Sequence, residues 1–225
     1  MSDDLEFQDY IYILPDWETV THEEIKKLLI SQFEERGEEC TETLWALVRL
    51  YSKDGQQDRA VGYVKRLIEM SDDSEEHAFY VFTLGQLMEQ MDDYASAKAY
   101  YEYSLGMRPC NEDLWYLIHN NLGYSLNQLG QHRDAEPYLK RAISIDSHRP
   151  NAYKNLGLAC EGLERLREAI ECYITATQVK PSDRRSLGHL ENLVDKHPSL
   201  FTDVPDLQSR LESCREAVQA AQVFR

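Results

Sequence analysis

The sequence predicts an all-α protein, a right-handed α-solenoid built from pairs of helices with capping helices at its ends. The strongest evidence is a repeat of 34 residues, because seven identities recur at that offset without a gap. The first copy holds Asn121, Leu122, Gly123, Leu129, Arg133, Ala135 and Ala142, and the second holds Asn155, Leu156, Gly157, Leu163, Arg167, Ala169 and Ala176. Repeats with a period of about 20 to 50 residues are typical of solenoids, in which each unit packs on its neighbours.

Glycines inside apolar helical segments give a second, independent indication of paired helices. Gly85, Gly123 and Gly157 each lie within a helical pattern, where glycine costs about 1 kcal/mol relative to alanine. A close approach of two helices would offset this cost. Small residues recur in the second helix of each pair, at Ala60, Ala97, Ala135 and Ala169.

Turn and capping signals divide these segments into helices. The turns between the two helices of each pair are expected at 53–55, 92–93, 129–130 and 164–165. Three residues are expected to cap the helices that follow them: Ser74 before Glu75 and Glu76, Asn111 before Glu112 and Asp113, and Asp183.

The repeat also has a recognisable internal spacing, W-x2-L-G-x2-Y, then A-x3-F, then P. The last unit matches it with Tyr153, Leu156, Gly157, Cys160, Ala169, Tyr173, Ala176 and Pro181. This spacing resembles that of the tetratricopeptide repeat (TPR) family. The resemblance covers about 41–183 and implies four repeats, at 41–74, 78–111, 116–149 and 150–183, the first of which has Val48 in place of the glycine.

Both ends of the chain differ from the repeats. Residues 1–20 form an acidic segment with an aromatic run, 10–17, which is expected to dock on the first helices or in the concave groove of its own or a neighbouring copy. Residues 21–40 contain an amphipathic helix that opens with the capping-box pair Thr21 and Glu24. Residues 184–225 are expected to hold capping helices, at about 183–196 and 204–222.

Composition limits the classes of partner. The net charge is −16, and residues 1–42 alone carry a net charge of −10. Nucleic acid is therefore not expected as a partner, whereas a neutral or basic polypeptide is expected. No membrane-spanning run or basic leader is present, and the five cysteines have no C-x-x-C spacing. A cytoplasmic protein with free thiols is therefore expected.

Catalytic signals are lacking in the sequence. The seven histidines show no H-E-x-x-H or other paired metal spacing, and no glycine-rich phosphate loop or nucleophile elbow occurs. The protein is therefore expected not to be an enzyme and to use neither a cofactor nor a metal.

The resemblance to the TPR family implies a peptide-binding groove lined by the first helix of each pair. Asn121 and Asn155, with His189 at the same register, are the central candidates, because an amide both donates to and accepts from an extended peptide backbone. The alternative is that these asparagines bridge adjacent helices, and that the aromatic residues belong to the core. The full set of implied groove residues is Trp45, Arg49, Phe79, Phe82, Gln86, Asn120, Asn121, Tyr124, Lys154, Asn155, Arg185 and His189.

Together these observations predict a protein–protein interaction module, an adaptor, scaffold or chaperone-like protein that holds an extended peptide in its concave groove. The alternative function is structural: a self-assembling module whose repeats mediate homo-oligomerisation.

Overall fold

The computed structural model describes residues 24–25, 27–28, 30–31 and 41–223, and within these ranges all regular structure is helical. The acidic segment predicted at 1–20 and most of the helix predicted at 21–40 lie outside the described residues. The chain divides into two compact units, Met1–Met70 and Ser71–Arg225.

Between residues 41 and 70, the first unit consists of the helix pair α3 (Thr41–Lys53) and α4 (Gln57–Met70). The two helices bury an apolar seam between them that includes Leu44, Leu47, Ala60, Val64 and Leu67. Val48 is also buried, 2% exposed, so the pair packs although it has no glycine at that position.

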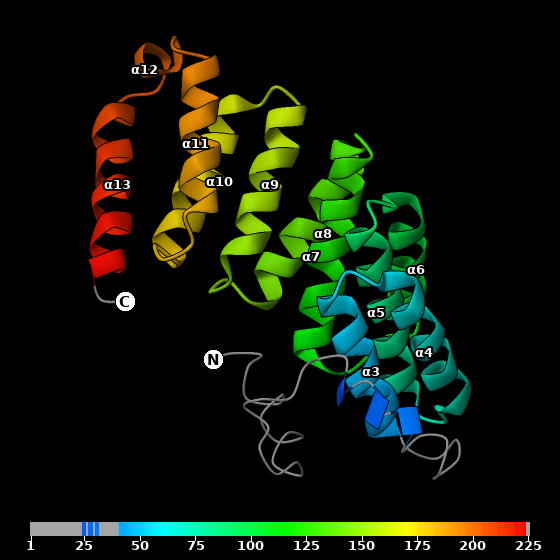
Figure 1. Cartoon of the computed structure of the whole chain (residues 1–225). Coiled ribbons are helices and arrows are strands. Elements are labelled where there is room, and N and C mark those ends of the chain that lie inside the picture. The colour runs from blue at the N-terminus through cyan, green and yellow to red at the C-terminus, as the bar shows by residue number, and fades with distance from the viewer. Residues whose placement is uncertain (1–23, 26, 29, 32–40, 224–225) are drawn as a thin grey trace. The chain divides into compact units, whose positions relative to one another are not determined.

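The second unit contains three further pairs and the C-terminal helices, which lie side by side in Figure 1. The pairs are α5 (Ser74–Gln90) with α6 (Tyr94–Gly106), α7 (Glu112–Gln128) with α8 (His132–Ile145), and α9 (Pro150–Gly162) with α10 (Leu166–Val179). They are followed by α11 (Arg185–Lys196), the short α12 (Leu200–Asp203) and α13 (Leu207–Val223).

The helix-internal glycines mark the places where the two helices of a pair meet. A Cβ atom on Gly85 would lie 2.5 Å from the ring of Tyr101, and one on Gly157 would overlap the ring of Tyr173 in the same way. A Cβ atom on Gly123 would instead lie 2.5 Å from the side chain of Leu139. The close approach predicted from the glycines is confirmed, because any larger residue would push α6, α8 or α10 away.

The four predicted turns are confirmed by backbone geometry. Each contains one residue in the left-handed region: Gly55 and Gly130, both with φ of 72°, Asp92 with φ of 59° and Glu164 with φ of 58°. This conformation ends the first helix of each pair and reverses the chain. Glycine adopts it without strain, which explains why two of the four turns use it.

Of the three predicted helix caps, Asn111 is confirmed, and Asp183 accepts a hydrogen bond from the amide of Arg185, the first residue of α11, at 3.1 Å. Asn111 Oδ1 accepts a hydrogen bond from the amide of Leu114 at 2.9 Å, at the start of α7. At α5 the cap is Asp73 and not Ser74, since Asp73 has an extended backbone and its Oδ1 accepts from the amide of Glu75 at 2.6 Å. Ser74 is already the first residue of the helix.

The C-terminal helices follow the prediction closely. α13 packs on α10 and α11 and buries Leu207, Leu211, Cys214 and Val218. Two ion pairs join α13 to these helices: Arg210 with Glu171 of α10 at 2.7 Å, and Arg215 with Glu191 of α11 at 2.8 Å. Of the described helices, none is both long and apolar enough to cross a membrane.

Candidate binding face

The first helices of the pairs form one continuous surface in the second unit. α5 packs on α7, and α7 packs on α9, whereas the second helices α6, α8 and α10 have no comparable contact with one another. We call the surface of α5, α7, α9 and α11 the first-helix face. The predicted residues that are exposed or half-buried on it are Phe79, Gln86, Asn121, Tyr124, Lys154, Arg185 and His189.

A chain of side-chain hydrogen bonds runs beneath this face. Asn155 Nδ2 donates to Asn120 Oδ1 at 3.1 Å, and Asn120 Nδ2 donates to Asn121 Oδ1 at 2.9 Å. Asn121 Nδ2 in turn donates to the hydroxyl of Tyr101 at 3.4 Å, and that hydroxyl donates to Glu89 Oε2 at 2.8 Å. The chain of bonds therefore joins α9, α7, α6 and α5.

Two asparagines predicted to line the groove are instead buried. Asn155 is 3% exposed and Asn120 is 6% exposed, so neither side chain reaches the surface. The prediction of direct ligand contact by these two residues is corrected: they bridge α9 and α7, as the alternative interpretation had it for Asn155. Asn121 is half-buried, so of the three asparagines it alone keeps part of its side chain at the face.

Phe82 also needs correction. Its ring is 1% exposed and lies 5.4 Å from the ring of Tyr101, in the core between α5 and α6. Phe82 therefore packs the helix pair and does not line a groove.

Lys154 interacts electrostatically with three charged residues of the second unit. Its side chain is half-buried on α9, and it makes no hydrogen bond or ion pair with any other described residue. Burial, reinforced by the charge of Arg185, lowers the pKa of the Lys154 amine, while Asp183 and Glu89 act in the opposite direction. Charges from α5, from α11 and from the turn before α11 therefore act on the amine, which forms no ion pair with a described residue.

Glu89 is the anionic group on α5 that acts on Lys154. Burial raises the pKa of the Glu89 carboxyl, although the hydrogen bond from Tyr101 and the charge of Lys154 act to lower it. Glu89 was not among the residues predicted from the sequence. A signal was present, because Glu161 and Tyr173 repeat the same spacing and form the same hydrogen bond, at 3.0 Å.

His189 and Arg185 bring α11 to the same cluster. The His189 ring stacks on Tyr173, with centroids 5.5 Å apart and planes at 15°, and burial, with the charge of Lys154, lowers the pKa of its imidazole. Arg185 is exposed and binds Asp183 at 2.6 Å, which lowers the pKa of Asp183 to about 2. The charge of Arg185 is therefore largely satisfied by Asp183.

The remaining predicted residues lie on α3, α5 and α7. Tyr124 is half-buried and meets the edge of Tyr94, with centroids 6.0 Å apart. Phe79 and Gln86 are half-buried on α5, with Phe79 packed against the core. Trp45 and Arg49 are half-buried on α3, in the first unit.

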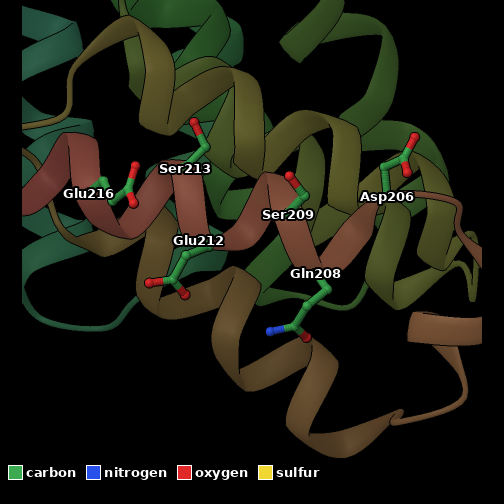
Figure 2. Close-up of a pocket in the computed structure, with 6 residues that line it drawn as sticks. All are labelled: Asp206, Gln208, Ser209, Glu212, Ser213 and Glu216. Atoms are coloured by element: carbon green, nitrogen blue, oxygen red, sulfur yellow. The ribbon is translucent and has the colours of Figure 1, made fainter.

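A separate hollow lies on the outer side of α13, and Figure 2 shows the six side chains that line it. They are Asp206, Gln208, Ser209, Glu212, Ser213 and Glu216, from α13 and the turn before it. These residues come from one segment, so the hollow offers no converging set of ligands. In the described part of the chain, no three histidine, cysteine or acidic side chains are grouped as a metal ion would require.

Comparison with known proteins agrees with this architecture. Residues 80–109 and 116–182 each match a family model described as tetratricopeptide repeat. A curated relative, the Drosophila melanogaster protein O-mannosyl-transferase Tmtc3, is 26% identical over 99 residues. That match covers 42% of this chain but only 11% of the fly protein, so it does not extend to the whole transferase.

Solved structures share the fold over most of the chain. MamA (41-end) from Desulfovibrio magneticus RS-1 has a TM-score of 0.59 at 19% identity, covering 81% of this chain and 93% of that one. YrrB, described as a TPR protein with an unusual peptide-binding site, has a TM-score of 0.58 at 20% identity, covering 87% of this chain and 96% of that one. At these identities the likeness concerns the fold.

Proposed function

Because the chain is a tetratricopeptide repeat protein, we propose that it is a non-enzymatic interaction module that holds an extended segment of another protein on its first-helix face. The observation that carries this proposal is Lys154. Charged groups on α5, on α11 and in the turn before α11 act on its half-buried amine, which makes no hydrogen bond or ion pair with the described residues.

A peptide would supply what this amine lacks. A partly buried ammonium without an acceptor is unfavourable, and a hydrogen bond to a charged donor contributes about 1.5 to 3 kcal/mol. Every extended peptide carries backbone carbonyl groups that can accept such a bond. The half-buried amide of Asn121 lies on the neighbouring helix α7 and offers a donor and an acceptor to the same backbone.

The wider composition supports a particular kind of partner. A net charge of −16 favours neutral or basic polypeptides over acidic ones and over nucleic acid. The described cysteines are free, which fits a reducing compartment such as the cytoplasm. The peptide-binding site described for YrrB gives a precedent on the same fold.

Selection from a library of short random peptides displayed on phage, with the full chain as bait, tests the proposal. Selected peptides are then titrated against the parent and against two matched variants, Lys154→Ala and Lys180→Ala. Lys180 is an exposed lysine at the end of α10, a second helix. We expect Lys154→Ala to weaken binding about tenfold or more, a loss of at least about 1.4 kcal/mol, and Lys180→Ala to leave it unchanged.

Two outcomes of this experiment would contradict the proposal. If no peptide is enriched and the molar mass of the chain rises with concentration in sedimentation experiments, the repeats serve self-assembly and the proposal is wrong. A peptide whose affinity is equally insensitive to both lysine variants would place binding on another surface.

A further inference from the structure

Gly188 is an exposed glycine inside α11, and a Cβ atom added to it would meet nothing within 4 Å. Its amide donates to the carbonyl oxygen of Arg184 at 3.0 Å, so the backbone at this position is regular helix. After proline, glycine is the residue least favourable in the interior of a helix, because it loses the most conformational freedom there. Packing within the described part of the chain therefore gives no reason for a glycine at this position.

Gly188 is not a further copy of the glycine that recurs in the repeats. In α9 that glycine is Gly157, and the ring of Tyr173 closes the space beside it. The residue 34 positions after Gly157 is Glu191, whereas Gly188 lies 34 positions after Lys154. In the register of the repeat, Gly188 on α11 is therefore the counterpart of the lysine on α9.

A hydrogen bond shows that this register also relates neighbours in space. Arg185 Nη2 on α11 donates to Asn151 Oδ1 on α9 at 3.3 Å, and these two residues are likewise 34 positions apart. Lys154 and Gly188 follow almost one turn later on the same two helices. Burial and the charge of Lys154 lower the pKa of His189, the residue next to Gly188. Gly188 is therefore the residue that α11 presents beside Lys154 on the first-helix face.

The position of the Lys154 amine makes the missing side chain at 188 meaningful. The amine is half-buried and has no acceptor among the described residues, so an acceptor from outside must come close to the helices to reach it. The carbonyl groups of a peptide lie on its main chain. A side chain at 188 would hold that main chain away from α11, whereas glycine allows another backbone to approach closely.

We propose that the main chain of the bound segment crosses α11 at Gly188, so that one of its carbonyl groups reaches the Lys154 amine. This inference rests on the proposed function and adds the place where the segment passes. The occupant is an extended, neutral or basic polypeptide segment. It presents its backbone to Gly188 and turns its side chains away, so the contact selects an extended main chain and not a particular residue.

Nuclear magnetic resonance of the full chain labelled with ¹⁵N-glycine tests the contact directly. The probe is a peptide selected on phage with the parent chain, and the signal of Gly188 is identified by its loss in Gly188→Ala. We expect this signal to shift or broaden when the peptide is added. Gly62 is the matched control, because it is also exposed inside a helix, α4, with nothing within 4 Å of an added Cβ. The Gly62 signal should stay in place.

Substitutions at the same two glycines give a second measurement. Gly188→Ala should weaken binding of the selected peptide several-fold, and Gly188→Leu should weaken it about tenfold or more, because a larger side chain keeps the main chain further away. Gly62→Ala and Gly62→Leu should bind like the parent. The thermal midpoint of Gly188→Ala should not fall below that of the parent, which separates the loss of affinity from unfolding.

The outcomes distinguish this inference from the proposed function. If both Gly188 variants bind like the parent while Lys154→Ala binds more weakly, the segment does not cross α11 at Gly188, and the proposed function stands. Equal losses at Gly62 and Gly188 would also overturn the inference. If no peptide is selected, or if Lys154→Ala binds like the parent, the proposed function is wrong and the inference fails with it.

Discussion

The side-chain amide of Asn155 donates a hydrogen bond to Oδ1 of Asn120 at 3.1 Å, joining α9 to α7 across the boundary between two repeats. Both residues are buried, and the chain of bonds continues through Asn121 to Tyr101. The asparagine at this register of the 34-residue repeat therefore stabilises the stacking of repeats in this protein.

Removal of this bond should destabilise the array. Asn155→Ala leaves the buried oxygen of Asn120 without that donor, which is expected to cost about 1 to 3 kcal/mol. Asn192→Ala is the matched control, because Asn192 is exposed on α11. Urea unfolding followed by circular dichroism should show a lower midpoint for Asn155→Ala alone, and an unchanged midpoint would mean that the bridge contributes nothing to stability.

Replacing glycine by alanine should change the stability of the protein in opposite directions at Gly157 and Gly188. A methyl group on Gly157 would overlap the Tyr173 ring, so Gly157→Ala should destabilise by about 1 to 3 kcal/mol. Gly188, inside α11, has nothing within 4 Å of an added Cβ, so Gly188→Ala should stabilise by up to about 1 kcal/mol. Thermal unfolding of the two variants checks this, and a shift of the same sign in both would contradict the packing described for α9 and α10.

Glu89→Gln should stabilise the protein near neutral pH. Burial raises the pKa of the Glu89 carboxyl above its ordinary value of 4.5, so the folded state holds the proton more tightly than the unfolded state. Ionisation therefore costs stability above the folded-state pKa, and this cost disappears below 4.5, where both states are protonated. Glutamine keeps an oxygen that can accept from Tyr101.

Urea midpoints of the parent and of Glu89→Gln at about pH 7 and about pH 4 check this expectation. The gain should be present at the higher pH and shrink at the lower one. Glu161→Gln serves as the comparison, since Glu161 accepts the equivalent bond from Tyr173 but also pairs with Lys196 at 3.7 Å. A variant of Glu89 that is less stable than the parent at neutral pH would show that burial is not the dominant effect.

The fold could be predicted from the sequence because its determinants are local and periodic. Gly85, Gly123 and Gly157 recur at positions where only a hydrogen fits, and the residues at 55, 92, 130 and 164 recur at left-handed turns. Each of these features depends on residues a few turns apart, so the spacing in the sequence carries the information.

The site could be predicted only in part, because the position of a residue within the 34-residue repeat does not determine whether its side chain is buried. Asn120 and Asn121 are adjacent, yet the first is buried and the second is half-buried. Asn121 and Asn155 share one register, yet only Asn155 is fully covered, because the packing of α9 on α7 differs from that of α7 on α5. Lys154 was one candidate among many in the sequence, and its lack of a partner among the described residues emerges only once α5, α9 and α11 are packed together.

The binding proposal leads to one decisive measurement, the affinity of a selected peptide for Lys154→Met compared with Lys180→Met, by isothermal titration calorimetry on variants whose thermal midpoints match the parent. Methionine keeps most of the side-chain volume and removes the charge at both positions. If the peptide binds on the first-helix face, its affinity should fall about tenfold or more in Lys154→Met and stay unchanged in Lys180→Met. Equal affinities in the two variants would contradict it.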